Sequence, residues 1–372
     1  MNFDFSDEQK FLKGEARKFL EANCPTSRVR KVLDDDGKAF DEELWKAVAG
    51  QGWLGATIPE EHGGLGLGHL ELCVIAEELG RVVAPIPFAS TVYFLAEAVM
   101  LAGDEAQKAE LLPKIAAGEV IGAVATSEGP GVISPGALQS TVEGGKLSGV
   151  KIPVTDGDIA AVALVLAKEN GKPGLYLAEL DASVTREAVS TLDPTRDAAK
   201  LTFNQTPVRR LGAAGEGFDL LEQIFDRAAV LLAFEQTGGA DRCLEMAKEY
   251  ALERYAFGRV IASYQAIKHK LADMYVKNEL ARSNAYYGAW ALNTNAPELP
   301  VAASAARIAA SEAFWFASKE NIQTHGGIGF TWEMDCHLYY RRSRQLSLVA
   351  GAPRVWKERL VSHLERRNAE AA

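Results

Sequence analysis

Four long helical patterns follow Gly217, and they constrain the fold of this chain more than any other feature. Apolar residues recur at helical spacing over residues 220–255, 266–292, 301–324 and 355–367, with short connections between the patterns. Long helices joined by short connections pack as antiparallel neighbours. The last third of the chain is therefore predicted to form a four-helix bundle.

The rest of the chain divides into a helical part and a strand-rich part. Ser6 and Gln9 form a capping-box pattern, and helical patterns follow over residues 42–49, 70–79 and 91–101. Aliphatic runs bounded by Gly, Pro, Asp and Asn cover residues 121–125, 159–166, 175–180 and 201–203. The sequence thus predicts an α+β fold with an N-terminal helical domain (1–118), a middle β-domain (119–215) and a C-terminal helical bundle (216–372).

Charge and composition exclude several classes of function. A net charge of −10 argues against a nucleic-acid partner, which requires a basic face. A basic cluster at Arg341, Arg342 and Arg344 is interpreted as a solvated helix face. No apolar stretch is long enough to span a membrane, and the N-terminus carries acidic residues where a signal peptide needs basic ones. Four scattered cysteines lack metal or disulfide spacing, so we expect a cytoplasmic protein without a metal.

Two motifs in the bundle suggest nucleotide binding. The first runs from Arg254 through Phe257 and Gly258 to Gln265, and the second is a Gln323 followed by a Gly326-Gly327 pair. An arginine fork suits a pyrophosphate, and a glutamine can both donate to and accept from an adenine edge. Adjacent glycines allow the backbone to approach a nucleotide closely.

These motifs, the α–β–α order and two N-terminal elements (Ile58 to Gly66 and Glu77 to Arg81) resemble the acyl-CoA dehydrogenase family. The pattern is most similar to subunits of bacterial heteromeric enzymes of the steroid-side-chain type. The resemblance implies an acyl-CoA substrate, FAD, electron-transferring flavoprotein as the electron acceptor, and a homo- or hetero-tetramer. It also implies that the FAD is bound mainly by a neighbouring subunit. The residues carried over to its adenine side are Arg254, Phe257, Gln265, Gln323, Gly326 and Gly327.

The flavin-ring side departs from the family pattern. The resemblance carries over Thr126 and Ser127 in the loop after the first strand, and Thr155 in the next flavin element. The Gly-Ser-Asp ending of that loop is absent, and Pro153 stands where the family has an aromatic residue. These departures weaken the prediction of a complete flavin site within this subunit.

The family's catalytic carboxylate is also missing. An ungapped count from the glycine pair places it at Ala350, followed by Gly351, which the resemblance places against the substrate. In the family this carboxylate removes a proton from the α-carbon of the thioester while a hydride leaves the β-carbon for the flavin. The Ala350 N–H can still polarise the thioester carbonyl.

Two carboxylates on the first bundle helix are candidates for the base, because some family members carry it there. A count back from Arg254 gives Ala228, and Asp226 lies two residues earlier; alternatively, Asp226 is an N-terminal helix residue favoured by the helix dipole. Glu235 lies within an apolar run, on the same helix face as Ala228. A charge there is costly unless paired, so Glu235 is either functional or neutralised by a partner.

Three functions remain open at this level. The first is a flavin-dependent acyl-CoA dehydrogenase that oxidises a CoA thioester. The second is a non-catalytic supporting subunit of a heteromeric dehydrogenase, which contributes the adenine side of the FAD site. The third is a flavin oxidase or monooxygenase of the same fold.

Overall fold

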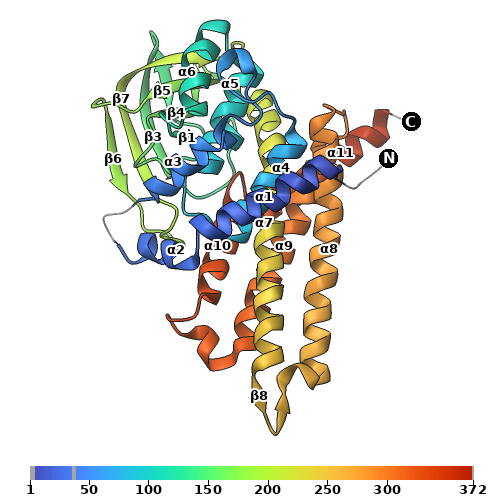
Figure 1. The fold of residues 1–372 in the computed structure, drawn as a ribbon. Coiled ribbons are helices and arrows are strands. Elements are labelled where there is room, and N and C mark those ends of the chain that lie inside the picture. Colours follow the sequence, from blue (N-terminus) through green and yellow to red (C-terminus); the bar gives the residue numbers. More distant parts are fainter. Residues whose placement is uncertain (1–4, 36–38, 371–372) are drawn as a thin grey trace. The chain divides into compact units, whose positions relative to one another are not determined.

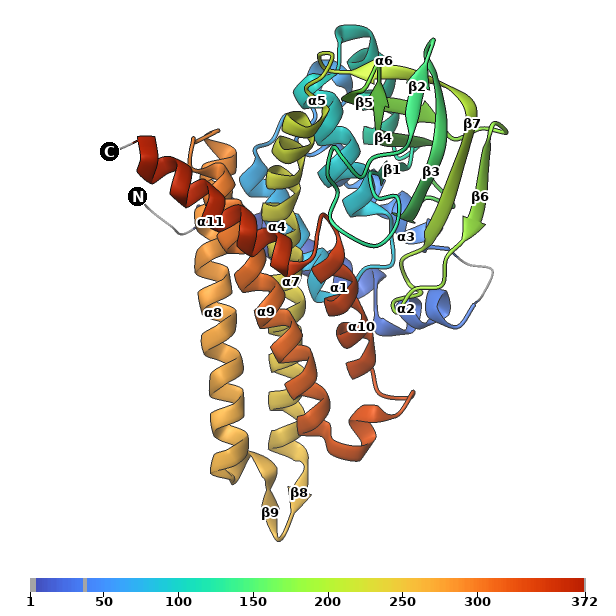
Figure 2. The same ribbon diagram turned by 180° about the vertical axis from the view of Figure 1, so that it is seen from behind.

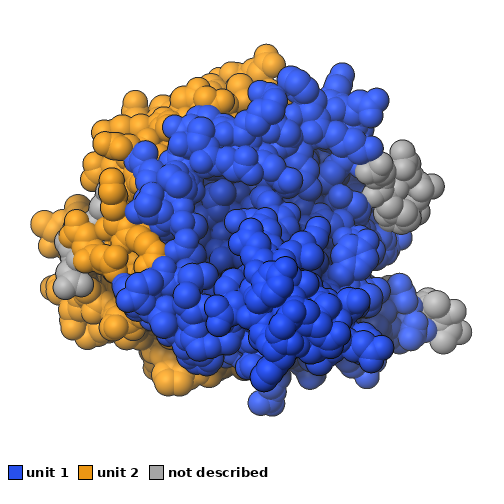
Figure 3. Space-filling model, turned by 60° about the horizontal axis from the view of Figure 1, so that its bottom comes forward, with its two compact units in different colours: residues 1–29, 69–84, 229–372 blue, residues 30–68, 85–228 orange. Residues whose placement is uncertain are grey.

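The computed structural model describes residues 5–35 and 39–370, which form two compact units (Figure 3). Unit 1 comprises residues 1–29, 69–84 and 229–372, and unit 2 comprises residues 30–68 and 85–228. Residues 1–4 lie outside the described part; the prediction that the acidic N-terminus is not a signal peptide rests partly on them. The predicted order of helical, strand-rich and helical segments along the chain is confirmed.

Unit 1 is helical. Its longest helices, α7, α8 and α9, run side by side (Figures 1 and 2). The first helix begins with the predicted capping box, in which the Ser6 and Gln9 side chains each accept from the other's backbone N–H. The helices that lie wholly or mostly in this unit are α1 (Asp7–Asn23), α4 (His69–Arg81), α7 (Gly217–Glu253), α8 (Gln265–Asn293), α9 (Leu299–His325), α10 (Cys336–Leu348) and α11 (Pro353–Glu370).

Helix α10 is absent from the sequence prediction. Its buried face includes Arg342, Ser343 and Ser347, which interrupt the apolar period by which the other bundle helices were found. The interpretation of the basic cluster as a solvated face is wrong for Arg342, which is only 1% exposed.

Helices α4 and α7 cross in direct backbone contact at two glycines. A Cβ added at Gly80 would lie 1.8 Å from the Glu235 carbonyl oxygen, and one added at Gly238 would lie 1.9 Å from the Glu77 carbonyl oxygen. No side chain fits at either position, since real Cβ atoms do not approach other heavy atoms so closely. The crossing therefore fixes the position of Glu235 relative to α4.

Buried carboxylates on α4 tie its neighbours together. Glu77 and Glu78 are almost fully buried. Lys13 of α1 donates to Glu77 at 2.7 Å, and Arg17 of α1 forms a two-pronged contact with Glu78 at 2.8 and 2.9 Å. Arg282 of α8 also pairs with Glu77. Each buried charge has a partner of opposite sign, as burial requires.

The helical part of unit 2 contains one unusual element. The predicted helix over residues 91–101 is a π-helix, η3 (Ala89–Ala96), which continues into α5 (Glu97–Ala102). Asp104 and Gln107 then form a capping box that starts α6, which the sequence analysis missed. The other helices are α2 (Thr26–Leu33), which spans both units, α3 (Glu42–Gly50), η1 (Trp53–Gly55), η2 (Glu60–His62) and α6 (Glu105–Ala116).

A seven-stranded sheet forms the β-part of unit 2. Its strands are β1 (Gly122–Ala125), β2 (Thr141–Glu143), β3 (Lys146–Thr155), β4 (Val162–Glu169), β5 (Lys172–Glu179), β6 (Val184–Ala188) and β7 (Ala198–Leu211). The order is β1-β4-β2-β3-β7-β5, and β4 also pairs with β5, so five strands close into a barrel. The strands β2, β3 and β6 were not predicted, because charged and polar residues interrupt their apolar pattern.

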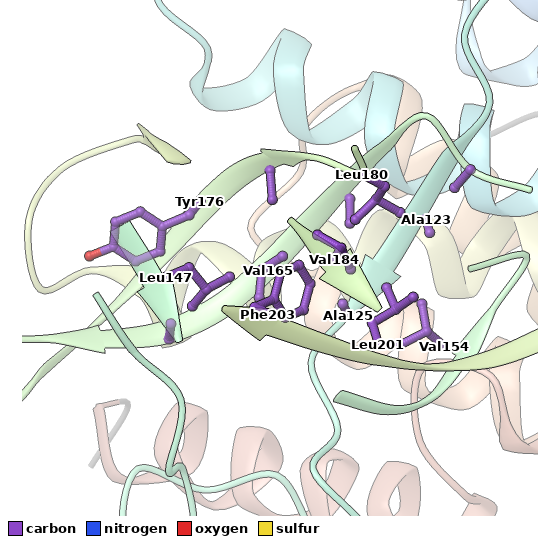
Figure 4. Close-up of a cluster of buried hydrophobic side chains, with 14 of the residues drawn as sticks. Ala123, Ala125, Leu147, Val154, Val165, Tyr176, Leu180, Val184, Leu201 and Phe203 are labelled. Atoms are coloured by element: carbon purple, nitrogen blue, oxygen red, sulfur yellow. The ribbon is translucent and has the colours of Figure 1, made fainter. Parts of the chain in front are cut away.

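An apolar cluster fills the interior of this sheet. Val165 of β4, Leu147 of β3, and Leu201 and Phe203 of β7 belong to this cluster (Figure 4). These side chains are almost fully buried, and such burial is the dominant stabilising contribution in a small β-structure. Over the described ranges, no helix combines the length and apolar character needed to cross a bilayer.

Candidate functional site

The Arg254 motif forms an exposed hairpin after α7. Strands β8 (Tyr255–Ala256) and β9 (Arg259–Val260) are joined by Phe257 and Gly258, whose φ angles of 53° and 81° define a tight two-residue turn. Phe257 is 97% exposed, and Arg254 is exposed as well. The hairpin therefore presents both side chains outward, away from the core of its own unit.

Contacts at the start of α8 hold Gln265 beside this hairpin. The Tyr264 hydroxyl donates to the Ala256 carbonyl at 2.9 Å, and the Arg259 guanidinium lies 4.0 Å from the centre of the Tyr264 ring. Gln265 follows as the first residue of α8 and is exposed. The first N–H groups of a helix have no intrahelical partner, so this helix start can offer donors to a ligand.

The Gly326-Gly327 motif leaves open space around its backbone. Gly326 ends α9 with a φ of 65° and begins η5 (Gly326–Phe330). A Cβ added at Gly329 would lie 2.5 Å from the Ile322 carbonyl oxygen, whereas one added at Gly327 would meet nothing within 4 Å. Packing within this chain therefore explains why residue 329 is a glycine, but it does not explain the glycine at residue 327. The open space suits close approach by a group from outside the chain.

The two motifs lie at the same end of the helices of unit 1, beyond the last turns of α7 and α9 (Figures 1 and 2). Gln323 is exposed on the last turn of α9. Beneath it, the buried ring of His325 stacks on Tyr250 at 4.2 Å, and burial lowers the pKa of this histidine. An apolar stack thus supports the turn that carries the glycine pair.

The residues proposed for the flavin-ring side belong to unit 2. Thr126 is 7% exposed and directly follows β1. The Ser127 hydroxyl donates to the Gly129 carbonyl at 3.0 Å, and the Ser127 carbonyl accepts from the Ile152 N–H at 2.9 Å. Thr155 is the last residue of β3. The structure thus places Thr126 and Ser127 beside β3.

Glu128 organises this loop, a role the sequence analysis missed. Its carboxylate accepts from the backbone N–H groups of Gln139 at 2.6 Å and Ser140 at 2.9 Å, and from the fully buried Lys151 at 2.7 Å. Burial opposes ionisation of Glu128, but the hydrogen bonds from Lys151, Ser140 and Gln139 lower its pKa to about 2. One carboxylate therefore connects the start of the loop, its end and strand β3.

Asp226 occupies a different part of α7 from the one expected. The helix begins at Gly217, so Asp226 lies in its third turn, and the interpretation as an N-terminal residue favoured by the helix dipole is wrong. Asp226 is 4% exposed. On either side of it, Phe225 packs edge-on against Phe94, and Arg227 pairs with the buried Glu97 at 3.5 Å.

Glu235 has the partner that its burial demands. Its carboxylate lies 3.8 Å from the guanidinium of Arg342, and both side chains are almost fully buried. Arg342 also donates to the carbonyl of Ala84, just after α4, at 3.2 Å. The ion pair therefore joins α7 and α10 to the end of α4. This arrangement fits the second of the two alternatives for Glu235, neutralisation by a partner.

The turn between α10 and α11 holds Ala350 and Gly351. Both have left-handed backbones, with φ angles of 58° and 107°. The Gly351 N–H donates to the Leu348 carbonyl at 3.1 Å, so this donor is already used within the chain. Within the described ranges the Ala350 N–H makes no such bond. The turn offers a backbone donor but no carboxylate at its tip.

Comparison with known proteins assigns the family. Residues 6–119 match the model of the acyl-CoA dehydrogenase N-terminal domain, and residues 215–364 match that of the C-terminal domain. The acyl-CoA dehydrogenase IpdE2 of Mycobacterium tuberculosis is 34% identical, over 96% of this chain and 98% of that protein.

Solved structures agree. The Tcur3481-Tcur3483 steroid ACAD is 32% identical with a TM-score of 0.88, and the ChsE4-ChsE5 complex from Mycobacterium tuberculosis is 26% identical with a TM-score of 0.89. Each match covers 98% of this chain and 99% of the other. On this evidence, the chain belongs to the acyl-CoA dehydrogenase family.

Proposed function

We propose that this chain is one subunit of a heteromeric, FAD-dependent acyl-CoA dehydrogenase, in which it supplies the adenine side of the FAD site. The exposed hairpin and the glycine turn support this role. Arg254 would hold the pyrophosphate, because its fork matches two phosphate oxygens. Gln265 and Gln323 would bind the adenine edge. The open space at Gly327 would admit the nucleotide against the backbone.

The bound FAD would supply the hydride acceptor for dehydrogenation between the α- and β-carbons of a CoA thioester. The residues of this chain would bind the cofactor and the thioester, whose carbonyl would meet the Ala350 N–H. Removal of the α-proton requires a carboxylate held close to that carbon. The position that carries it in the family is Ala350, which has no ionisable group.

The observation that carries the heteromeric proposal is the Glu235–Arg342 ion pair, because it gives the buried Glu235 a structural role and leaves the Ala350 turn without a base. The proton acceptor would then come from a sister chain. The Tcur3481-Tcur3483 and ChsE4-ChsE5 structures, each named for two proteins, support such an assembly.

A second candidate keeps the base within this chain. Asp226 is a buried carboxylate two residues from Ala228, the alternative base position on α7. In that case the chain would be a complete acyl-CoA dehydrogenase, and Asp226 would take the α-proton.

The remaining features of the proposal follow from the family. The electron acceptor would be electron-transferring flavoprotein, and the assembly would be a tetramer. We place it in the cytoplasm, where the four buried cysteines, all free thiols, would stay reduced.

The test is an FAD count and an anaerobic reduction assay, on the chain expressed alone and with candidate sister chains. We expect half-stoichiometric FAD in a heteromer, and reduction by acyl-CoA only in that heteromer. Asp226→Asn in this chain should leave reduction intact, as should Asp219→Asn, a matched change at an exposed position of the same helix. Loss of reduction in Asp226→Asn alone would favour the second candidate. A homomer with one FAD per chain that acyl-CoA reduces would overturn the heteromeric proposal.

A further inference from the structure

Arg307 of α9 is a fully buried cation whose contacts converge on the turn after α10. One terminal nitrogen donates to the Gln236 side chain and to Ser311, the latter at 3.2 Å. The other donates to the carbonyls of Leu346 and of Val349, the latter at 2.9 Å. Burial lowers the pKa of Arg307 to about 9 while the Glu235 carboxylate opposes the shift, so the guanidinium is a cation at neutral pH.

The Val349 carbonyl and the Ala350 N–H belong to one peptide group. The peptide is trans, so its N–H points in the opposite direction from its carbonyl. A cation bound to the carbonyl thus directs the N–H away from Arg307. It also polarises the N–H, since hydrogen bonds in a chain strengthen one another in a medium of low dielectric.

The surrounding contacts leave this peptide little freedom. Gln236 and Ser311 hold the guanidinium from α7 and α9. On the other side, the Gly351 N–H is bonded to the Leu348 carbonyl, whereas the Ala350 N–H has no acceptor among the described residues. The left-handed backbone of Ala350, rarely adopted by residues other than glycine, persists under these constraints.

We infer that Arg307 is the positioning residue of the thioester site, which orients and polarises the Ala350 N–H toward the thioester carbonyl. The inference rests on the proposed function in one respect, that an acyl-CoA binds at this turn. Arg307 itself does not touch the ligand. It acts through the Val349–Ala350 peptide, so a change at Arg307 should weaken recognition of the carbonyl and spare recognition of the rest of CoA.

A pair of ligands isolates that interaction. Acetyl-CoA has the thioester carbonyl but no β-carbon, so it cannot be dehydrogenated; S-ethyl-CoA replaces the carbonyl by a methylene group. Dissociation constants for both would be measured by calorimetry on the FAD-containing assembly. The wild-type protein should prefer acetyl-CoA about fivefold, the size expected of one hydrogen bond.

Arg307→Lys should reduce this preference to about onefold, because a single ammonium cannot hold both carbonyls in the arginine geometry. Arg282→Lys is the matched control, a largely buried arginine of the same unit (its side chain is 16% exposed) that pairs with Glu77, Asp241 and Glu279. The Arg282→Lys protein should keep the preference for acetyl-CoA over S-ethyl-CoA even if the change lowers its stability. A general structural effect would weaken binding of both ligands equally and leave the ratio unchanged.

A third variant keeps the inference testable if Arg307→Lys does not fold. Gln236→Met removes one acceptor of the guanidinium but leaves the cation in place, so it should lower the preference partially. An unchanged ratio in a folded Arg307→Lys protein, or in Gln236→Met when Arg307→Lys does not fold, would overturn the role of Arg307. If the wild-type assembly binds neither ligand, acyl-CoA does not bind here, and the proposed function fails with the inference.

Discussion

The ion pair between Glu235 and Arg342 allows a sharp prediction about stability. The two charges lie 3.8 Å apart and are buried. At an effective dielectric constant of about 20, their attraction is about 4 kcal/mol. Removal of one partner leaves the other buried and uncompensated, which costs about 3–5 kcal/mol. We therefore expect Glu235→Gln and Arg342→Met each to lower the free energy of unfolding by about that amount.

The double variant separates a pair from two independent residues. Glu235→Gln combined with Arg342→Met removes both charges of the pair, so its cost should be less than the sum of the single costs by about 4 kcal/mol. Urea unfolding of all four proteins, followed by circular dichroism, supplies this cycle. The folded fraction of Glu235→Gln should retain flavin reduction in the heteromer.

Two results would refute this reasoning. Additive single costs would show that the pair does not couple. A Glu235→Gln protein of unchanged stability that has lost flavin reduction would show that Glu235 is the base. A lower stability with intact reduction per folded protein is the outcome that the contacts of Arg342 with Glu235 and Ala84 predict.

Two further predictions concern the packing of each unit. The pKa of Glu128 is lowered from 4.5 to about 2, so its contribution to stability is full above pH 5 and is lost as the pH falls toward 2. Urea unfolding midpoints measured between pH 6 and pH 3 should therefore fall less in Glu128→Gln than in the wild type. Parallel pH profiles of the two proteins would contradict this prediction. Gly238→Ala would force a Cβ to within 1.9 Å of the Glu77 carbonyl oxygen and should lower the free energy of unfolding, measured by thermal unfolding, by about 3 kcal/mol or more. Gly14→Ala, on the open face of α1, should raise it by about 0.5–1 kcal/mol. Equal effects of the two glycine changes would rule out the close α4–α7 crossing.

The long helices were predictable because their apolar period is strong and local. The pattern over residues 220–255 identified α7 to within a few residues, and those over residues 266–292 and 301–324 identified α8 and α9. Helix α10 was not predicted, because polar residues interrupt the apolar pattern of its buried face. Burial of Arg342 depends on a carboxylate supplied by another helix. A local window contains no information about such a partner.

The same distinction applies to the candidate site. The hairpin at Phe257 and the glycine turn at Gly326 follow from short motifs whose backbone requirements are local. The role of Arg307 does not, because its carbonyl partners belong to α10, which was not predicted. Glu128 directly follows Thr126 and Ser127 in the flavin loop, yet its contact with Lys151 requires the register of a strand that was not predicted.

The central claim is that this chain donates the adenine side of a shared FAD site, and the FAD content of an Arg254→Gln variant tests it most directly. Arg254 is exposed, and its side chain forms no hydrogen bond or ion pair with the described residues, so its replacement should leave folding intact. In the assembly with its sister chain, we predict that Arg254→Gln loses most of the FAD while the subunits stay associated. Full FAD retention in that variant would contradict the account.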